Sequence, residues 1–568
     1  MKLFNLIKKW FENQENLFYL FLIILIAPNI ALCFTEPMPV TAKICNVLLP
    51  FSIYYVVMSR SKNCGWTFWI LFPFIFFGAF QIVLLYLFGQ SIIAVDMFLN
   101  LVTTNSNEAL ELLDNLIPAI VIVVVLYVPA LILAMISIFR KQRLPEQFLQ
   151  RERKRAWAGL GIGLLSLCLA YLTDARYELK SDLYPANVCY NIGLAIRRTI
   201  LTNNYKETSG DFTFHAKATH PENKREIYVM VVGETSRAAN WALYGYDRDT
   251  NPELSKIFGL TAFDHVLTES NTTHKSVPML LSPVNAYTFD SIYHQKGIIT
   301  AFKEAGFQKA FFSNQRHNHS FIDFFGMEAD TFDFIKEETS NSNYNPSDDE
   351  LLKLVSAELE KGASKQFIVL HTYGSHFNYR ERYPANEAFF LPDFPVDANV
   401  KFKDNLINAY DNSTRYTDDF LARLIRMLQE QEADAAMLYT SDHGEDIFDD
   451  ERHLFLHASP VPSYYQIHVP FLVWMSEDYR KSYPELQQAA QANRQKNISS
   501  GISFFQTMLE LGGIETPYRN DSLSVTNALF TEKPRVYLND HNEARPLDDL
   551  GMEKEDFEML KKKGIKMN

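Results

Sequence analysis

The chain has 568 residues, of which 47% are apolar and 14% are aromatic, and its formal net charge is −13 at pH 7. This length and apolar content argue against a single soluble core, so more than one kind of domain is expected. The negative charge argues against nucleic-acid binding, because such proteins need clustered cations to displace counterions from phosphates.

The first third of the chain contains five apolar stretches, at residues 17–34, 43–59, 66–88, 116–138 and 157–173. Each has about the 17–25 residues that a helix needs to cross the hydrocarbon core of a bilayer. We therefore predict a transmembrane domain over residues 1–175, with five helices and an extracytoplasmic loop at 89–115. The first stretch could be a signal peptide, but Leu32 is too large for the cleavage position and four further stretches follow. We interpret it as an uncleaved anchor.

Positive charges in the short loops predict the orientation of these helices, because Lys and Arg are retained on the cytoplasmic side. Lys2, Lys8 and Lys9 precede the first span, Arg60 and Lys62 separate the second from the third, and seven cations lie within residues 140–155. The loops at 35–42 and 89–115 contain no Lys or Arg. An odd number of spans then places the chain after residue 175 outside the cytoplasm.

After a predicted linker at 176–204, short β-rich runs alternate with amphipathic helical stretches. The expected strands are 226–232, 309–313, 367–371, 436–440 and 469–474, and the expected helices include 298–305, 349–361 and 417–431. This alternation is typical of an α/β sandwich with a central mixed sheet, so we assign residues 205–568 to one domain. Only Cys189 of the five cysteines lies away from the apolar stretches, so no disulfide framework is expected in that domain.

Polar side chains gather immediately after the predicted strands. Glu234 follows the first strand, Asp442 and His443 follow the fourth, and His376 lies shortly after the third. Ligands of open α/β sheets bind at the carboxyl ends of the strands, so we expect these side chains to converge. Carboxylates combined with imidazole suit zinc, with manganese next.

Thr273, in the polar run ESNTTHKSVP, is the candidate nucleophile. Coordination to a dication lowers the pKa of a hydroxyl, and a helix beginning near Pro278 would direct amide groups at a phosphate oxygen. Taken alone, Thr273 would be interpreted as a cap or turn residue and Glu234 as a solvated turn residue. The hypothesis depends on all these residues occurring together in one domain.

The motifs VVGETSRAANWALYGY, THKSVP, LHTYGSHFNYRERYP, YDNSTRYTDDFL, SDHGE and LHAS resemble those of the phosphoethanolamine transferase family, lipid A modifying enzymes that include the mobile colistin-resistance proteins. The resemblance implies an alkaline-phosphatase-like domain in the periplasm, anchored in a bacterial inner membrane. It implies a zinc site with four ligands, Glu234, Thr273, Asp442 and His443. It also implies that His376 and His457 lie at a second metal or at the substrate phosphate.

The resemblance further implies the two substrates. Phosphatidylethanolamine would donate the headgroup, and lipid A or another lipopolysaccharide would accept it. The residues Asn100, Thr104 and Glu108 recur every four positions, which places them along one stripe of a helix. The resemblance to the family implies that this stripe contacts the ethanolamine headgroup. The alternative is that it is the solvent-exposed face of a helix at the membrane interface. We expect a monomer with no nucleic-acid partner.

Three departures from the family pattern bear mainly on the acceptor. Relatives carry cysteine pairs bracketing the nucleophile, where this chain has Glu269 and Met279, so packing alone is expected to hold the fold. A family lysine loop is replaced by SNQRHNHSFID, which leaves Arg316, His317 or His319 for the phosphate contact. The segment between SDHGE and LHAS is about two residues longer than in the family.

The expected reaction is a two-step transfer through a phosphothreonine at Thr273. A sulfatase or phosphodiesterase of the same superfamily is one alternative, but SVPML lacks the arginine of the sulfatase Cys/Ser-x-Pro-x-Arg context. A phosphoglycerol transferase, which shares the spans and the threonine, is a second alternative. A receptor with an inactive metal site is a third, weakened by the presence of every ligand type.

Overall fold

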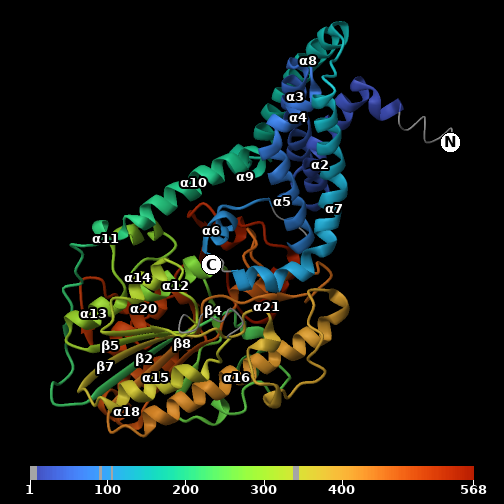
Figure 1. The fold of residues 1–568 in the computed structure, drawn as a ribbon. Coiled ribbons are helices and arrows are strands. Elements are labelled where there is room, and N and C mark those ends of the chain that lie inside the picture. Colours follow the sequence, from blue (N-terminus) through green and yellow to red (C-terminus); the bar gives the residue numbers. More distant parts are fainter. Residues whose placement is uncertain (1–8, 37, 89–91, 104–105, 337–344, 568) are drawn as a thin grey trace. The chain divides into compact units, whose positions relative to one another are not determined.

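The structure is a computed structural model that describes residues 9–36, 38–88, 92–103, 106–336 and 345–567, without the side chains of 87–88, 100–103 and 106–115. The chain forms two compact units, and Figure 1 shows the helices of the first and the sheet of the second. The first unit comprises Met1–Leu99 and Ala109–Arg197, and the second comprises Asn100–Glu108 and Arg198–Asn568.

The first unit is built from long apolar helices. Within the described residues, four of them are long and apolar enough to cross a membrane: α2 (Gln14–Thr35), α3 (Val40–Arg60), α7 (Ser106–Phe139, spanning from Leu116) and α8 (Glu146–Thr173). A fifth span exists if the bent pair α4 (Cys64–Ile70) and α5 (Phe72–Phe88) is counted as one. The prediction of a helical membrane domain is therefore confirmed, with four to five spans.

The third predicted helix differs from expectation because it is broken. The α4 and α5 axes meet at 62°, and the break falls at Leu71. Pro73 lies in the first turn of α5, where a proline is tolerated because the first amides of a helix have no partner inside it. Hydropathy alone registers this segment as one continuous stretch, because it reports apolar content and not the axis of the helix.

Asparagine side chains buried in the first unit hold the segment predicted as a linker. Asn29 Nδ2 donates to the carbonyls of Asn46 and Tyr184, each at 2.7 Å. Asn187 and Asn191 lie on α10 (Ala186–Asn203), and their amides donate to the Ile93 carbonyl at 3.1 and 2.9 Å. In an apolar environment each such bond satisfies a carbonyl that water cannot reach. The predicted linker thus contains a helix whose beginning is fastened to the first unit.

The second unit is organised around a seven-stranded mixed sheet with the order β3-β11-β8-β2-β7-β5-β6. Its strands are β2 (Glu226–Gly233), β3 (Leu260–Ala262), β5 (Gln308–Ser313), β6 (Thr331–Phe334), β7 (Lys365–His371), β8 (Asp434–Ser441) and β11 (Phe471–Met475). Strand β11 runs antiparallel to β3 and β8, and the others are parallel. The expected α/β class is confirmed, while the two short edge strands β3 and β6 were not predicted.

Alternation along β2 divides the core into two layers. Tyr228, Met230 and Val232 pack against helices α12 (Thr273–Leu281), α13 (Ile298–Glu304), α14 (Phe321–Gly326) and α20 (Ser500–Leu511). Ile227, Val229 and Val231 pack against α15 (Asp349–Glu360) and α16 (Lys403–Gln429). Figure 1 shows these two helix sets on opposite faces of the sheet. Because both faces are covered, the strands are continuous apolar runs.

Helix α16 begins at Lys403, well before the expected start at residue 417. The early part carries Asp411, Asn412, Ser413 and Thr414, all of which are at most 2% exposed. A buried run of polar residues breaks the apolar periodicity by which a helix is recognised in a sequence.

Shorter elements complete the chain: α6 (Val95–Thr103), α9 (Leu179–Asp182), α11 (Tyr205–Thr208), α17 (Tyr464–Ile467), α18 (Glu477–Ser482), α19 (Pro484–Asn493), α21 (Lys554–Lys562), β1 (Lys217–Ala218), β4 (His265–Leu267), β9 (Asp446–Ile447), β10 (Phe455–Leu456), β12 (Asn497–Ser499), β13 (Ile514–Glu515), β14 (Val536–Leu538) and β15 (Ala544–Pro546).

Asp446 makes the stability of the second unit depend on pH. The side chain is 1% exposed, and its two oxygens accept from Ser463 Oγ at 2.6 Å and Gln466 Nε2 at 2.7 Å. Burial raises the pKa of Asp446 to about 8, from an ordinary value of 3.8. Between these two pH values the folded chain keeps a proton that the unfolded chain has lost, so stability falls as pH rises through this window. In Asp446→Asn the amide oxygen should still accept from Gln466 Nε2, and the amide NH2 would donate to Ser463 Oγ in place of accepting from it. The change should flatten that fall, with a gain on the order of a few kcal/mol above pH 8.

Thermal unfolding of the full chain across this pH window measures the effect. Asp450→Asn is the control, because it should change the stability in the opposite direction. Although burial raises the pKa of Asp450, hydrogen bonds from Arg452 lower it below its usual value. Asp450 therefore stabilises the fold above its unfolded pKa, and Asp450→Asn should be less stable there. Equal pH slopes for the parent chain and Asp446→Asn would contradict the interpretation.

Candidate functional site

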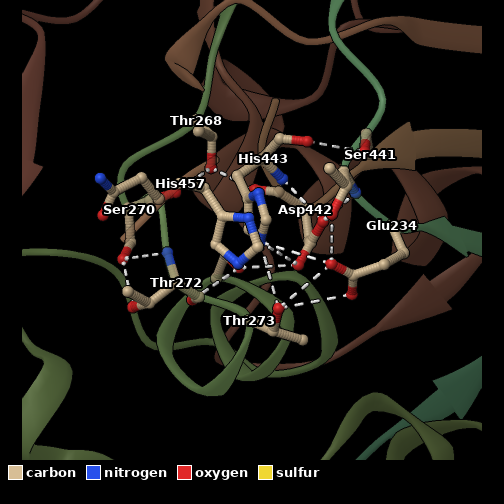
Figure 2. Close-up of polar contacts among 12 residues, drawn as sticks. Glu234, Thr268, Ser270, Thr272, Thr273, Ser441, Asp442, His443 and His457 are labelled. Atoms are coloured by element: carbon tan, nitrogen blue, oxygen red, sulfur yellow. Dashed lines mark hydrogen bonds and ion pairs between the residues drawn. The ribbon is translucent and has the colours of Figure 1, made fainter. Parts of the chain in front are cut away.

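Three buried polar side chains converge at the carboxyl ends of two neighbouring strands. Glu234 follows β2, and Asp442 and His443 follow β8. These strands are parallel, with Gly233 opposite Ser441, so the residues after them meet at one edge of the sheet. The three side chains are at most 1% exposed, and one ligand atom from each lies within 4.8 Å of the others. Figure 2 shows them pointing toward one another.

The geometry of His443 directs a lone pair at the two carboxylates. Its Nδ1 lies 2.9 Å from the Gly444 carbonyl, which fixes the hydrogen on Nδ1. Its Nε2 lies 3.4 Å from Glu234 Oε1 and 3.3 Å from Asp442 Oδ2. Burial raises the pKa of Asp442, and although burial alone would lower the pKa of His443, the carboxylates of Asp442 and Glu234 raise it. This surplus of buried negative charge, with two oxygen donors and one nitrogen donor, fits a zinc ion.

Thr273 adds a hydroxyl to this group. Its Oγ1 lies 3.1 Å from His443 Nε2 and 3.4 and 3.3 Å from the two oxygens of Glu234. Helix α12 begins at Thr273 itself and contains Pro278, so the expectation of a helix starting near Pro278 was wrong by about one turn. The helix can start this early because Thr272 is extended and Pro278 removes only one amide from the helix.

Thr272 is the adjacent hydroxyl, but it points elsewhere. Its Oγ1 lies 3.1 Å from Ser270 Oγ, and Figure 2 shows the Thr272–Ser270 pair turned away from Glu234. Thr272 is 4% exposed and precedes the helix as its N-cap residue. The two neighbouring threonines therefore have different surroundings, which sequence alone could not distinguish.

Gln315 is a site residue that the sequence interpretation missed. Its Nε2 donates to Glu234 Oε2 at 3.1 Å and to the Thr372 carbonyl at 3.2 Å. It follows β5 by two positions, so the strand-end rule that identified Glu234 could also have found it. Gln315 lies in the run SNQRHNHSFID and thus reaches the cluster of Glu234, Asp442 and His443. His317 Nδ1 instead lies 3.4 Å from Asp323 Oδ2.

His457 and His376 extend the site as a row of rings. The His457 ring centre lies 4.2 Å from that of His443 and 6.1 Å from that of His376. His457 Nδ1 lies 3.0 Å from Glu445 Oε1, and His376 Nδ1 lies 2.7 Å from the Phe377 carbonyl. The Phe377 carbonyl can only accept, so the hydrogen of His376 lies on Nδ1 and its Nε2 is left for another partner. Burial lowers the pKa of both imidazoles, so both are neutral near pH 7.

Tyr373 supports the end of this row. Its ring stacks on His376 with centres 5.1 Å apart and planes 12° apart. Two buried cations, Lys336 and Arg382, lie 2.9 and 4.1 Å from the centre of the tyrosine ring. Stacking and cation–π contacts of this kind restrict the plane of the His376 imidazole.

Glu269 stands at one of the positions where the family resemblance led us to expect a cysteine. Its carboxylate is 1% exposed and accepts from the amides of Ala286 at 3.3 Å and Ile502 at 3.0 Å. All five cysteines, which lie in the described part of the chain, are free. We expected packing alone to hold the fold in the absence of disulfides. This expectation needs correction, because the buried Glu269 carboxylate joins the segment before α12 to the start of α20.

The predicted stripe lies beyond what the structure describes. Thr104 is outside the described residues, and the side chains of Asn100 and Glu108 are outside them as well. Their contact with a headgroup stays a prediction.

Comparison with known proteins gives two family matches. A model described as sulfatase matches residues 226–514, and a model described as phosphoethanolamine transferase EptA/EptB matches residues 62–199. The chain is 31% identical to phosphoethanolamine transferase EptA of Escherichia coli K12 over 305 residues, which cover 52% of this chain and 55% of that protein. It thus spans about half the length of the curated relatives it matches.

Among the solved structures that are similar to the chain, two are described here. The integral membrane lipooligosaccharide phosphoethanolamine transferase A of Neisseria meningitidis has a TM-score of 0.71 at 23% identity, over 90% of this chain and 97% of that one, which supports the fold. The C-terminal periplasmic domain of EptC from Escherichia coli, a complex with Zn, has a TM-score of 0.54 at 25% identity, over 59% of this chain and 96% of that one.

Removing one charge from the buried group should remove the metal. Glu234→Gln and Asp442→Asn keep the size of each side chain but weaken an oxygen donor to a dication. Zinc affinity should fall by more than the roughly 10–100-fold that loss of an outer hydrogen-bond partner costs. Elemental analysis of the purified full chain measures zinc content, and Glu269→Gln is the matched control because that buried carboxylate lies outside the group. Full zinc occupancy in both site variants would refute the ligand assignment.

Proposed function

Because the chain belongs to the phosphoethanolamine transferase family of the sulfatase superfamily, we propose that it transfers phosphoethanolamine from phosphatidylethanolamine to lipid A or another lipopolysaccharide acceptor. The observation that carries this proposal is the position of Thr273 Oγ1, which lies within 3.4 Å of both Glu234 and His443. A hydroxyl held against a metal-binding group at the start of a helix is suited to attack phosphorus.

Glu234, Asp442, His443 and Thr273 would hold the zinc ion. When bound, it would lower the pKa of the threonine hydroxyl and offset negative charge on the phosphoryl group.

In the first step Thr273 Oγ1 attacks the phosphorus of phosphatidylethanolamine. The Oγ1–P bond forms, the bond from phosphorus to the glycerol oxygen breaks, and diacylglycerol leaves carrying the proton released by the hydroxyl. Gln315 holds the Glu234 carboxylate through the bond at 3.1 Å, and so keeps the residues around the hydroxyl in place. The product of this step is phosphoethanolamine on Thr273.

In the second step an acceptor oxygen attacks the same phosphorus and the bond to Oγ1 breaks. The proton of the acceptor hydroxyl or phosphate returns to Thr273, which restores the starting state. His457 and His376 lie along the row of rings that begins at His443, where a neutral imidazole can accept this proton at its unprotonated nitrogen and relay it.

We also propose where the reaction takes place. The EptC domain to which this chain is similar is periplasmic, and the distribution of Lys and Arg favours the same side of the membrane for the second unit. The donor is a bilayer lipid, so a catalytic unit tethered by four to five spans meets it at high effective concentration. The stripe of Asn100, Thr104 and Glu108 is proposed to contact its ethanolamine group, and the chain is proposed to act as a monomer.

A hydrolase of the same superfamily remains the alternative activity, with water in place of the acceptor. Such a hydrolase would use Thr273 and the cluster of Glu234, Asp442 and His443 in the same way, so it would differ only in the second step. A phosphoglycerol transferase would differ in the donor headgroup.

The two adjacent threonines provide a direct test of the nucleophile. Thr273→Ala should abolish transfer, with a loss of roughly 10⁴-fold or more in rate. The Thr235 hydroxyl also donates to Glu234, at 2.7 Å, but Thr235 is fully buried whereas Thr273 is partly exposed, so Thr235 cannot replace it. Thr272→Ala should be far milder, since the Thr272 side chain makes no capping bond to the helix and the change removes only its contact with Ser270 Oγ. Transfer is measured as headgroup incorporation into lipid A by mass spectrometry.

The covalent intermediate can be located in the same system. Incubation with phosphatidylethanolamine and no acceptor should leave a phosphoethanolamine adduct on the peptide containing Thr273. An adduct on Thr272 or Ser276 would move the nucleophile by a few residues. Persistent transfer by Thr273→Ala, with no adduct on any residue, would show that the acceptor attacks the donor directly.

A further inference from the structure

Three large apolar side chains stand exposed on one loop of the second unit. Phe389, Leu391 and Phe394 are 57%, 66% and 70% exposed, and we refer to residues 389–394 as the 389–394 loop. It lies between β7 and α16. Other exposed large apolar residues of the described second unit, such as Phe258 and Leu529, occur singly along the chain. Exposed apolar side chains that cluster in this way usually mark an interaction surface, whereas single ones are ordinary on a solvated surface.

The backbone of the loop is held firmly in this arrangement. Asn405, Asn408 and Asn412 recur at spacings of three and four on α16, so they lie along one face of the helix. Their amides donate to three carbonyls of the loop and its end, those of Pro395 at 3.1 Å, Pro392 at 2.8 Å and Phe390 at 3.0 Å. Asn412 Oδ1 also accepts from the amides of Phe389 and Phe390, at 2.9 and 2.8 Å.

The bonds from these three asparagines keep the loop in place, whereas exposed apolar side chains on a loose loop would tend to fold inward. Here the polar groups of the backbone are satisfied by the helix, and the apolar side chains are the part directed outward. The loop is also joined to the segment after His376, because Tyr383 Oη donates to Asp393 Oδ2 at 2.7 Å and accepts from Asn412 Nδ2 at 3.2 Å.

The surroundings of the loop indicate the chemistry of its partner. The Arg415 and Arg248 guanidinium groups lie 4.1 and 3.9 Å from the ring centres of Phe389 and Phe390. Both cations are paired with carboxylates, Arg415 with Asp249 at 3.1 Å and Arg248 with Asp411 at 2.6 Å. The rim therefore has polar groups but balanced charge, which matches a zwitterionic lipid interface and not a strongly anionic one.

We propose that the 389–394 loop is a bilayer-contact surface that inserts Phe389, Leu391 and Phe394 into the interfacial region of the membrane. The chain carries its own spans, so a bilayer is always available to this unit at high effective concentration. Three side chains offer less area than a stable protein–protein interface needs, whereas they suffice to add to an existing anchor. The proposal rests on the spans and is independent of the transferase activity.

Fluorescence of the full chain in phosphatidylcholine vesicles tests the contact directly. Phe394→Trp places a reporter in the loop, and Phe258→Trp is the matched control at another exposed aromatic residue. The native tryptophans are common to both variants, so the comparison isolates the added one. Brominated lipids should quench the added fluorescence of Phe394→Trp and leave that of Phe258→Trp unchanged, and iodide in the buffer should do the reverse.

Equal quenching of both variants by iodide, with no effect of brominated lipid on Phe394→Trp, overturns the proposal. Protection of Phe394→Trp from iodide without quenching by brominated lipid also overturns it, because a protein partner or a second copy would then cover the loop.

A second arm measures the consequence for turnover. The triple variant Phe389→Ser, Leu391→Ser and Phe394→Ser should turn over bilayer-embedded phosphatidylethanolamine about tenfold more slowly than the parent chain. It should turn over a water-soluble phosphoethanolamine diester at the parent rate. Phe258→Ser is the control, and an unchanged thermal midpoint shows that the loop variant is folded. An equal rate on the embedded lipid counts against the contact. If the parent chain turns over neither substrate, the proposed function fails while the fluorescence arm still decides the loop.

Discussion

The burial of two carboxylates and one imidazole at the ends of β2 and β8 is the constraint on which the second unit depends. Glu234, Asp442 and His443 have almost no contact with solvent, and nearby carboxylates in a low-dielectric interior repel one another. Backbone donors relieve part of this cost, since the amides of Thr235 and His443 donate to Asp442 Oδ1 at 3.1 and 2.7 Å. A dication would offset the remainder, and the parallel pairing of β2 with β8 is what brings the three side chains together.

Segments that are distant in sequence fix the helix that presents Thr273 to this group. Glu269 ties the segment before α12 to the start of α20 through the Ile502 amide. On the helix itself, Lys275 Nζ donates to the Asn539 carbonyl at 3.0 Å. These polar contacts take the place of a covalent bracket, and a carboxylate that accepts two amides can hold two segments together without a disulfide. The position of the candidate nucleophile is therefore a property of the whole domain.

The two units use the same device at different places. In the membrane helices Asn29 satisfies the carbonyl of Tyr184, and on α16 three asparagines satisfy carbonyls of the 389–394 loop. An amide side chain is short and can donate twice, so it can fasten irregular backbone to a neighbouring helix. The first use fastens the beginning of the segment that leads out of the membrane, and the second leaves an apolar surface facing outward. Both suit a protein whose proposed donor is a lipid.

The sequence by itself determined the features that depend on local pattern. Runs of apolar residues gave the membrane helices and the five longer strands, and the rule that ligands gather at strand ends identified Glu234, Asp442 and His443. The tertiary structure decided what depends on contacts between distant segments. It broke the third span at Leu71 and started α12 at Thr273. It extended α16 over a polar stretch that is buried, and it brought Gln315 to Glu234 across 81 positions of sequence. Periodicity records only whether a residue faces the core or solvent. The partner that it meets depends on the order of strands in the sheet, and no local pattern encodes that order.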